Sequence, residues 1–285
     1  MRRGYPWWSR GLAGPVVGLA LLWAVGVPPA RAQETKDDQP DRLPTGEKIL
    51  DKTIKARGGR EAFEALTSRV SKGTIEIAAG GQNIKGKLET YAAPPNKFYH
   101  LRDLGAAGKI ELGCDAEVYW AIERGKARLR QGDELRAATE QADFLALLNW
   151  RDYYDNPECL GKETIDGRSC YKVAVTNKDG ETEHRFYDRK TGLLCKMEST
   201  TKGQQGDVKN ETRYDDYRDV GGVKFPFKVV QAGTAGAQKQ VTTITWTSIE
   251  VNVDLPEDRF ALPESVAKLV RKPAPPRPGG AEKKP

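Results

Sequence analysis

The chain has 285 residues, with 46 Lys and Arg against 40 Asp and Glu, and a formal net charge of +6. Residues 1–32 hold four arginines and no acid, and residues 271–285 hold five basic residues against one acid, so the stretch between them is slightly acidic at −2. A nucleic-acid-binding protein is expected to show a concentrated basic face, and this composition therefore argues against a nucleic-acid partner.

The first 32 residues have the three parts of a secretory signal peptide. Arginines precede an apolar run over residues 11–27, and the A-R-A sequence at 30–32 places small residues at both cleavage positions. The apolar run is shorter than the roughly 18 residues that a membrane span needs. We therefore expect export and cleavage after Ala32, with a retained membrane anchor as the alternative.

The mature chain is expected to begin with a lead-in and two helices. Residues 33–44 are polar and contain proline, which predicts a flexible segment ahead of a domain over residues 45–270. Thr45 is a suitable N-cap for a helix that runs to Ala56 with apolar residues at helical spacing. A shorter helix is expected over Arg60–Leu66.

From residue 70 onward, polar and apolar residues alternate, which predicts antiparallel strands with one face toward water. This first set of strands is expected over Val70–Ile77, Ile84–Tyr91, Lys97–Leu104, Gly108–Cys114 and Glu117–Glu123. The glycines at 80 and 81 predict a hairpin turn between the first two, because glycine adopts the positive φ angles of tight hairpins.

A helix is expected over residues 133–150, with Asp133 as its N-cap. Apolar residues recur there at steps of three and four, from Leu135 to Trp150. Such a wide apolar stripe needs an apolar surface beneath it, so this helix should cover the concave side of the sheet.

A second set of strands follows this helix. It is expected over Cys159–Ile165, Arg168–Thr176, Glu181–Tyr187, Leu193–Thr200, Asp207–Tyr217, Val223–Gln231 and Gln238–Val251. Pro226 lacks an N–H and predicts an edge strand or a bulge at its position. Residues 271–285 are rich in Pro, Gly and Lys, which predicts a disordered basic tail. The fold class is therefore α+β, with one large curved antiparallel sheet covered by a few helices.

The residues that could carry chemistry are scattered. Cys170 and Cys195 lie on predicted strands two apart, roughly 9–10 Å in a simple meander, whereas a disulfide needs Cα atoms within about 7 Å. We therefore expect free thiols unless the strand order differs. His100 and His184 lack the spacing of a zinc site, and no G-x-S-x-G sequence surrounds a serine. The sequence thus predicts no metal, no cofactor and no catalytic site.

Six segments resemble the LolA/LolB-like family of periplasmic lipoprotein carriers, especially its broad group of outer-membrane lipoprotein-sorting proteins. They are residues 58–77 (GGREAFEALTSRVSKGTIEI), 91–98 (YAAPPNKF), 113–120 (GCDAEVYW), 143–154 (DFLALLNWRDYY), 187–198 (YDRKTGLLCKME) and 217–229 (YRDVGGVKFPFKV). These are strand and turn signatures without a catalytic residue. The resemblance implies a LolA-like incomplete antiparallel β-barrel, helices that plug its open side, a hydrophobic cavity for acyl chains, and a periplasmic location.

The resemblance also implies an arginine in an early strand that holds the helical cover closed, for which Arg69 and Arg102 are the candidates. Large apolar residues either fill the core or line the ligand cavity, where burial of an acyl chain gains about 0.8 kcal/mol per methylene. The cavity candidates are Trp120, Ile122, Phe144, Leu148, Trp150, Ile244 and Trp246.

Two functions follow from this reading. The first is an exported, non-catalytic carrier or chaperone that binds the acyl chains of lipids or lipoproteins in the half-barrel. The alternative is an envelope module with the same fold that binds protein partners and transports no lipid. In the alternative, the basic tail over residues 271–285 would be a tether or an electrostatic contact to anionic surfaces, and peripheral contact with a membrane is expected from it.

Overall fold

The computed structural model describes residues 42–203, 206–256 and 258–270. The predicted signal peptide (1–32), most of the predicted lead-in (33–44) and the predicted tail (271–285) lie outside the described residues. The helices and strands below belong to the unit that begins at Leu43. Within the described ranges, none of the helices has both the length and the apolar character needed to cross a bilayer.

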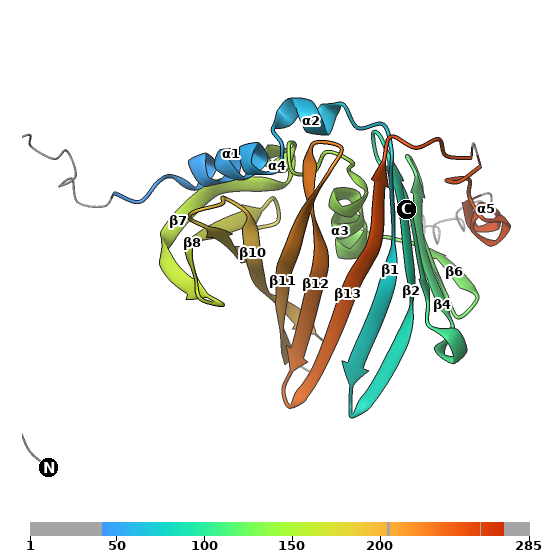
Figure 1. Ribbon diagram of the computed structural model, residues 1–285. Coiled ribbons are helices and arrows are strands. Elements are labelled where there is room, and N and C mark those ends of the chain that lie inside the picture. The colour runs from blue at the N-terminus through green and yellow to red at the C-terminus, as the bar shows by residue number, and fades with distance from the viewer. Residues whose placement is uncertain (1–41, 204–205, 257, 271–285) are drawn as a thin grey trace, which may run out of the picture. The chain divides into compact units, whose positions relative to one another are not determined.

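Five α-helices, one short 3-10 helix and thirteen strands make up the described chain (Figure 1). In chain order they are α1 (Gly46–Ala56), α2 (Arg60–Glu64), β1 (Arg69–Ala79), β2 (Gln82–Ala93), β3 (Lys97–Asp103), η1 (Gly105–Ala107), β4 (Lys109–Asp115), β5 (Tyr119–Glu123), β6 (Lys126–Leu129), α3 (Gly132–Ala142), α4 (Trp150–Tyr153), β7 (Tyr154–Ile165), β8 (Arg168–Asn177), β9 (Thr182–Asp188), β10 (Leu194–Gly203), β11 (Gly206–Val220), β12 (Val223–Ala235), β13 (Gln238–Val251) and α5 (Glu264–Val270). The sequence pattern does not predict β6, the first part of β7 or α5.

All the strands belong to one antiparallel sheet in the order β6-β5-β4-β3-β2-β1-β13-β12-β11-β10-β9-β8-β7. Two meanders, β1–β6 and β7–β13, are joined through the first and last strands, with Ile75 opposite Ile244. The outer strands β6 and β7 do not pair with each other, so the sheet curves without closing (Figure 1). The predicted incomplete antiparallel barrel is confirmed.

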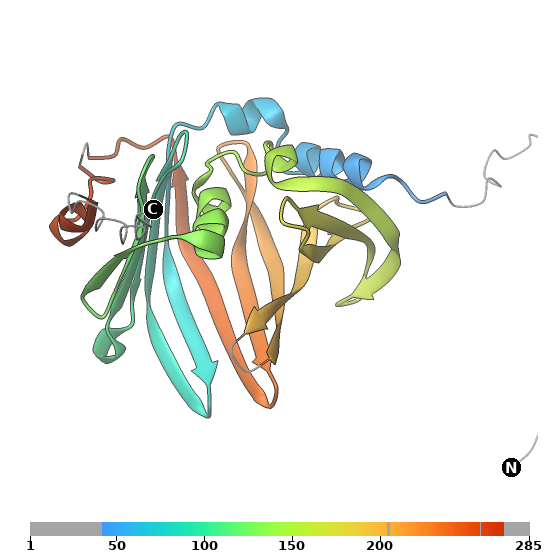
Figure 2. The same ribbon diagram turned by 180° about the vertical axis from the view of Figure 1, so that it is seen from behind.

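The helical segment between β6 and β7 covers the open side of this sheet. Because β6 and β7 lie at opposite edges, the chain that joins them must cross from one edge to the other. Figure 2 shows α3 against the concave side, between the two ends of the sheet. The connectivity alone therefore places α3 where a cover is expected.

The predicted helix over residues 133–150 is wrong in its length. Helix α3 ends at Ala142, and α4 begins only at Trp150. Asp143 has extended backbone angles, and its carboxylate accepts hydrogen bonds from the Leu145 N–H at 2.9 Å and from Tyr153 Oη at 2.8 Å. A short acidic side chain that bonds nearby backbone in this way competes with helix, so the apolar stripe beyond Ala142 folds as turns.

Two smaller expectations have clear outcomes. The Thr45 N-cap of α1 is confirmed, since its hydroxyl accepts a hydrogen bond from the Lys48 N–H at 3.4 Å. Pro226 lies in β12 opposite Tyr217, where β11 and β12 keep a constant register, so the structure has no bulge between them at this proline. The pairing of β12 with β13 begins only at Lys228, so the missing N–H of Pro226 costs no bond to β13.

The two clusters that hold the helices and the central strands lie on the concave face. One cluster joins α1, α2 and α4 to strands β8, β9 and β11–β13, and it includes the buried side chains of Leu50, Phe63, Leu148, Trp150, Val173 and Phe225. A second cluster lies on the central strands and contains Ile75, Leu88, Leu104, Val229 and Ile244. Burial of these apolar side chains, at about 25 cal/mol per Å², is the main force that holds the helices to the sheet.

Candidate functional site

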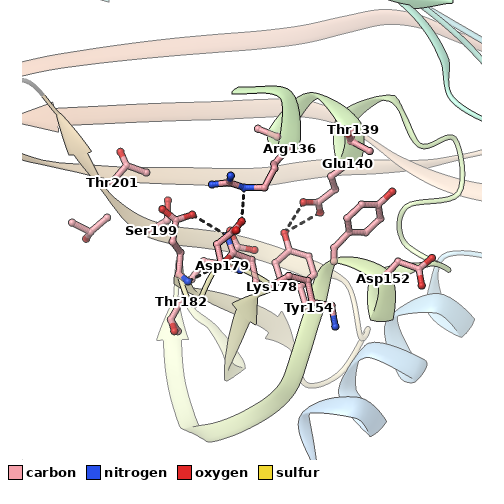
Figure 3. Close-up of a pocket in the computed structure, with 16 residues that line it drawn as sticks. Arg136, Thr139, Glu140, Asp152, Tyr154, Lys178, Asp179, Thr182, Ser199 and Thr201 are labelled. Carbon is pink, nitrogen blue, oxygen red and sulfur yellow. Dashed lines mark hydrogen bonds and ion pairs between the residues drawn. The ribbon is translucent and has the colours of Figure 1, made fainter. Parts of the chain in front are cut away.

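Helix α3 is attached to the β7–β10 end of the sheet through buried polar groups (Figure 3). Both oxygens of the Glu140 carboxylate, on α3, accept from Tyr154 Oη at 2.9 Å. The Arg185 guanidinium of β9 lies 3.9 Å from the same carboxylate and forms a second ion pair with Glu183. The four side chains of this network (Glu140, Tyr154, Glu183 and Arg185) therefore join α3 to two strands.

Burial makes this network sensitive to the loss of any one partner. Arg185 is only 8% exposed, and its guanidinium carbon lies 4.1 Å from the centre of the Tyr154 ring. Burial alone would lower the pKa of Arg185, but nearby charges, including Glu183 and Glu140, raise that pKa overall. Burial also raises the pKa of Glu140, although Arg185 and Tyr154 act in the opposite direction. A buried charge is tolerable only while it stays paired.

A pocket of about 390 Å³ lies beside this network, between α3 and the β8–β9 turn. An ion pair between Arg136 of α3 and Asp179 of the turn crosses the pocket (Figure 3). The residues that line the pocket come from α3, α4, the β8–β9 turn, β9 and β10. They include Arg136, Ala137, Glu140, Tyr154, Lys178, Asp179, Glu183 and Thr201. Residues with charged or hydroxyl side chains make up most of this lining, but more of the pocket surface comes from their carbon atoms than from their polar atoms.

The seven cavity candidates from the sequence do not come together in one place. Phe144, Leu148, Trp150 and Trp246 share the cluster under α1 and α2, and Ile244 belongs to the cluster on the central strands. The lining of the pocket beside α3 contains none of the seven. A role for them in ligand binding remains a prediction.

Trp120 and Ile122 lie on the opposite face of the sheet from Trp246. Strand pairing carries Trp120 across the sheet to Tyr91 of β2, and carries Trp246 through Gly73 to Leu88 of the same strand. Tyr91 and Leu88 are three positions apart on a regular strand, so they point to opposite faces. Leu88 is in the concave core, which places Trp120 on the convex face.

The convex face has its own packing around Trp120. The Trp120 ring lies over Gly113, where an added Cβ would come within 2.3 Å of Cζ2 of the indole ring. The Tyr99 ring is 6.2 Å away, and α5, with its fully buried Val266, packs against the adjacent strand β6. Trp120 is thus a core residue beneath the C-terminal segment, and the sequence pattern missed α5, which covers this side.

Neither of the arginines expected to hold the cover reaches α3. Arg102 Nε donates to His100 Nε2 at 2.9 Å, and His100 Nδ1 is 2.9 Å from the Thr90 hydroxyl. Arg69 lies over the Phe225 ring. The arginine that contacts α3 is Arg185, in the second meander. The alternation of residues 181–187 is consistent with an inward position for Arg185. The resemblance, however, implies an arginine in an early strand, and β9 is a late one.

Cys170 and Cys195 lie closer together than the spacing of their strands indicates. The strand order is β8-β9-β10 as expected, yet the sulfurs of Cys170 and Cys195 are 3.7 Å apart. The pairing of β10 with β9 shifts between Leu194 and Lys196, and this bulge turns Cys195 toward Cys170 in a small buried cluster with Ile165 and Phe186. The structure holds both as free thiols. In the described ranges, no three His, Cys, Asp or Glu side chains gather as metal ligands would.

Comparison with known sequences finds two partial matches. A family model described as an uncharacterized protein matches residues 143–264. An uncharacterized protein of Methanocaldococcus jannaschii is 25% identical over 224 residues, which cover 75% of this chain and 52% of the relative. The chain therefore spans about half the length of this curated relative.

Solved structures give a fuller match. A DUF1329 family protein from Desulfovibrio piger superposes with a TM-score of 0.55 at 15% identity, covering 76% of this chain and 98% of its own. A LolA superfamily protein from Nitrosomonas europaea gives 0.54 at 16%, covering 77% and 99%. An outer-membrane lipoprotein-sorting protein domain from Vibrio parahaemolyticus, described as putative, gives 0.54 at 10%, covering 76% and 97%. The fold of this chain is LolA-like, as the sequence resemblance implies.

Proposed function

We propose that the chain is an exported, non-catalytic carrier that binds an acyl chain or a lipidated protein on the concave face, with α3 as its movable cover. The observation that carries this proposal is a contrast between the apolar lining of the concave face and the polar contacts that attach α3 to it. The concave face is lined by an apolar cluster, whereas α3 is attached to the β7–β10 end by ion pairs and hydrogen bonds. The buried apolar side chains of α3 are the small ones of Ala138 and Ala142, of which Ala142 packs beside Phe98. Charged groups that separate can be hydrated, so opening α3 costs less than pulling apart an apolar interface.

The proposal extends to the organisation of the chain. Residues 1–32 would be a cleaved signal peptide and residues 33–44 a flexible lead-in to a half-barrel domain over residues 45–270. The basic tail over residues 271–285 would make peripheral contact with an anionic membrane surface. The periplasm would then be the working compartment, and lipid or lipoprotein acyl chains the cargo.

The direct test is native mass spectrometry of the full chain purified after export from an envelope-competent host. We expect an adduct with the mass of a fatty acid or phospholipid, released when the protein is denatured. A clean mass that is unchanged by added lipid would overturn the carrier function.

A matched pair of variants tests the role of α3. Ala137 and Gln141 are both exposed on α3, but only Ala137 lines the pocket between α3 and the β8–β9 turn. Ala137→Trp should fill this pocket, hold α3 in place and slow uptake of a fluorescent fatty acid about tenfold. Gln141→Trp adds the same ring outside the pocket and should leave the uptake rate unchanged. Equal rates for both variants would show that α3 does not move during loading.

A second candidate function is a module that binds a protein partner and carries no lipid. The lining of the pocket beside α3 favours it, because its charged and hydroxyl groups can hydrogen-bond a peptide segment while its carbon atoms contact that segment's side chains. In that case, lipid would be absent from the native mass spectrum, and Ala137→Trp would weaken capture of the partner.

A further inference from the structure

Two arginines with no ion-pair partner among the described residues lie together under the turn between α1 and α2. Arg57 directly follows α1, and Arg69 is the first residue of β1. Their guanidinium carbons lie 5.7 Å and 5.5 Å from the centre of the same ring, that of Phe225 in β12. Both side chains are half-buried. This arrangement concentrates positive charge at the edge of an apolar core.

Arg57 is held firmly in this position. Its Nε donates to the Lys224 carbonyl at 2.9 Å, and its own carbonyl accepts from the Lys224 N–H at 2.8 Å. The guanidinium also lies over the Phe63 ring, at 5.2 Å. The α1–α2 turn is close against the end of β12, since a Cβ on Gly58 would come within 2.1 Å of the Gly222 carbonyl oxygen.

Arg69 is the less satisfied of the two. Within the described ranges, its guanidinium contacts the Phe225 ring and makes neither a hydrogen bond nor an ion pair. Burial, and then the charge of Arg57, lower the pKa of Arg69 to about 10. A desolvated guanidinium beside a second positive charge is unfavourable without an anion. The Arg69 guanidinium and the remaining N–H groups of Arg57 therefore have no carboxylate partner among the described residues, although both guanidinium groups lie near the same ring.

We propose that Arg69 and Arg57 form a binding site for an oxyanion, specifically the phosphate of an amphiphile whose apolar part lies along the concave face. Guanidinium groups bind phosphate oxygens in a planar, bidentate way and are more easily desolvated than lysine ammonium groups. The rings of Phe63 and Phe225 connect this site to the apolar cluster under α1 and α2. The inference rests on the proposed carrier function, because the anion is the head group of the carried amphiphile.

The experiment compares three probes on the full chain after export. Dihexanoyl phosphatidic acid carries both parts of the ligand, dihexanoylglycerol carries the same acyl chains without phosphate, and inorganic phosphate is the head group alone. Binding of each is measured by titration calorimetry for the native protein and for Arg69→Gln. Arg60→Gln is the control, because Arg60 is a nearby exposed arginine that pairs with Glu64 and has no contact with Phe225.

We expect the native protein to bind the phosphatidic acid at least tenfold more tightly than the diacylglycerol. Arg69→Gln should remove this preference, Arg69→Lys should restore part of it, and Arg60→Gln should keep it. Arg69→Gln should not lower the melting temperature, because it removes an unpaired charge. A lower melting temperature without any change in the preference would indicate a merely structural arginine and would overturn the site.

The other outcomes separate the site from the carrier function. If only inorganic phosphate binds, and only with Arg69 present, the site stands with free phosphate as its ligand and the carrier function fails. If both lipids bind equally and Arg69→Gln changes neither affinity, the carrier function stands and the anion site is wrong. If none of the three probes binds, both proposals fail.

Discussion

The two halves of the concave face are built on different physical principles. Under the central strands β1, β2, β12 and β13, Ile75, Leu88 and Ile244 are almost completely buried against one another. Under α3, at the β7–β10 end, the contacts are the Glu140–Arg185–Glu183 ion pairs and the Tyr154 hydroxyl. The central cluster is apolar, whereas the α3 end adds these polar contacts to the apolar packing of Val173, Val175 and Tyr187.

This difference shows which part of the molecule can move. An apolar interface loses its whole burial free energy when it opens, since water offers no substitute for the lost contacts. A polar interface regains hydration when it opens, so its net cost is much smaller as long as each partner can reach water. The central strands therefore fix the fold, and the α3 end is suited to opening and closing.

The largest effect is expected from removing Arg185. Arg185→Gln leaves two partly buried carboxylates, those of Glu140 and Glu183, without the counter-charge of Arg185. We expect the free energy of unfolding to fall by about 3–5 kcal/mol, measured by urea denaturation. Hydrogen exchange should rise first in α3. The control Arg60→Gln removes an exposed arginine paired with Glu64 and should have no measurable effect. A loss below about 1 kcal/mol for Arg185→Gln would contradict the buried network.

A cavity in the apolar half should instead weaken the whole molecule. Leu88 is fully buried on the concave face, so Leu88→Ala should lower the free energy of unfolding by about 3 kcal/mol. Its neighbour Lys87 points to the other face and is exposed, which makes Lys87→Ala the matched control. Hydrogen exchange should rise throughout the central strands. A rise confined to α3 would mean that the two halves do not differ as described.

The sequence predicts the sheet much better than it predicts the faces. Period-two alternation identifies most strands because each antiparallel strand has one buried and one wet face. The side on which a residue lies depends on pairing across several strands, and on the register shift between Lys72 and Gly73 where β1 meets β13. Trp120 and Trp246 are both large aromatic residues in strands, and only this register separates them onto opposite faces.

The polar network under α3 depends on contacts that are distant in the sequence. Glu140 and Arg185 are 45 residues apart, and no local pattern indicates that they meet. The early end of α3 has a different reason. The apolar stripe continues past Asp143 at helical spacing, whereas in the folded chain the Asp143 carboxylate bonds to the turn that follows. The bulge at Cys195 is likewise a local feature, and the 3.7 Å between the two sulfurs does not follow from the ideal spacing of strands two apart.

A buried histidine gives the apolar half its own response to pH. Burial, and then the charge of Arg102, lower the pKa of His100 to about 3, whereas the unfolded chain takes up this proton near pH 6.5. The unfolded state therefore binds more protons between these values, and stability falls as pH drops from 6.5 toward 3. Between pH 7 and pH 5, His100 should account for about 2 kcal/mol of the loss.

His100→Gln should abolish this part of the acid destabilisation. The measurement is urea denaturation of the variant and the native protein at pH 7 and at pH 5. His184→Gln removes the other histidine of the chain and should keep the full difference. If His100→Gln loses as much stability as the native protein between the two pH values, His100 is not the group that titrates.

The smallest effect concerns the pH dependence of α3 itself. Burial raises the pKa of Glu140, with Glu183 and Asp143 adding to the rise while Arg185 and Tyr154 oppose it. The folded state then holds this proton to higher pH than the unfolded chain does, so Glu140 weakens the attachment of α3 as pH rises through its raised pKa. Because Glu140 is partly exposed, we expect only about a threefold fall in the hydrogen-exchange protection of α3 between pH 5 and pH 7. Glu140→Gln should flatten this dependence.

Glu134, on the same helix, is the control for that last measurement. Its carboxylate pairs with Arg128, whose hydrogen bond lowers the pKa of Glu134, so this residue stays charged throughout the range from pH 5 to pH 7. Glu134→Gln should leave the slope of α3 protection against pH unchanged. If the pH dependence of α3 protection is unchanged in Glu140→Gln, another group titrates. The attachment of α3 would then depend on the arrangement of its contacts and not on the charge of Glu140.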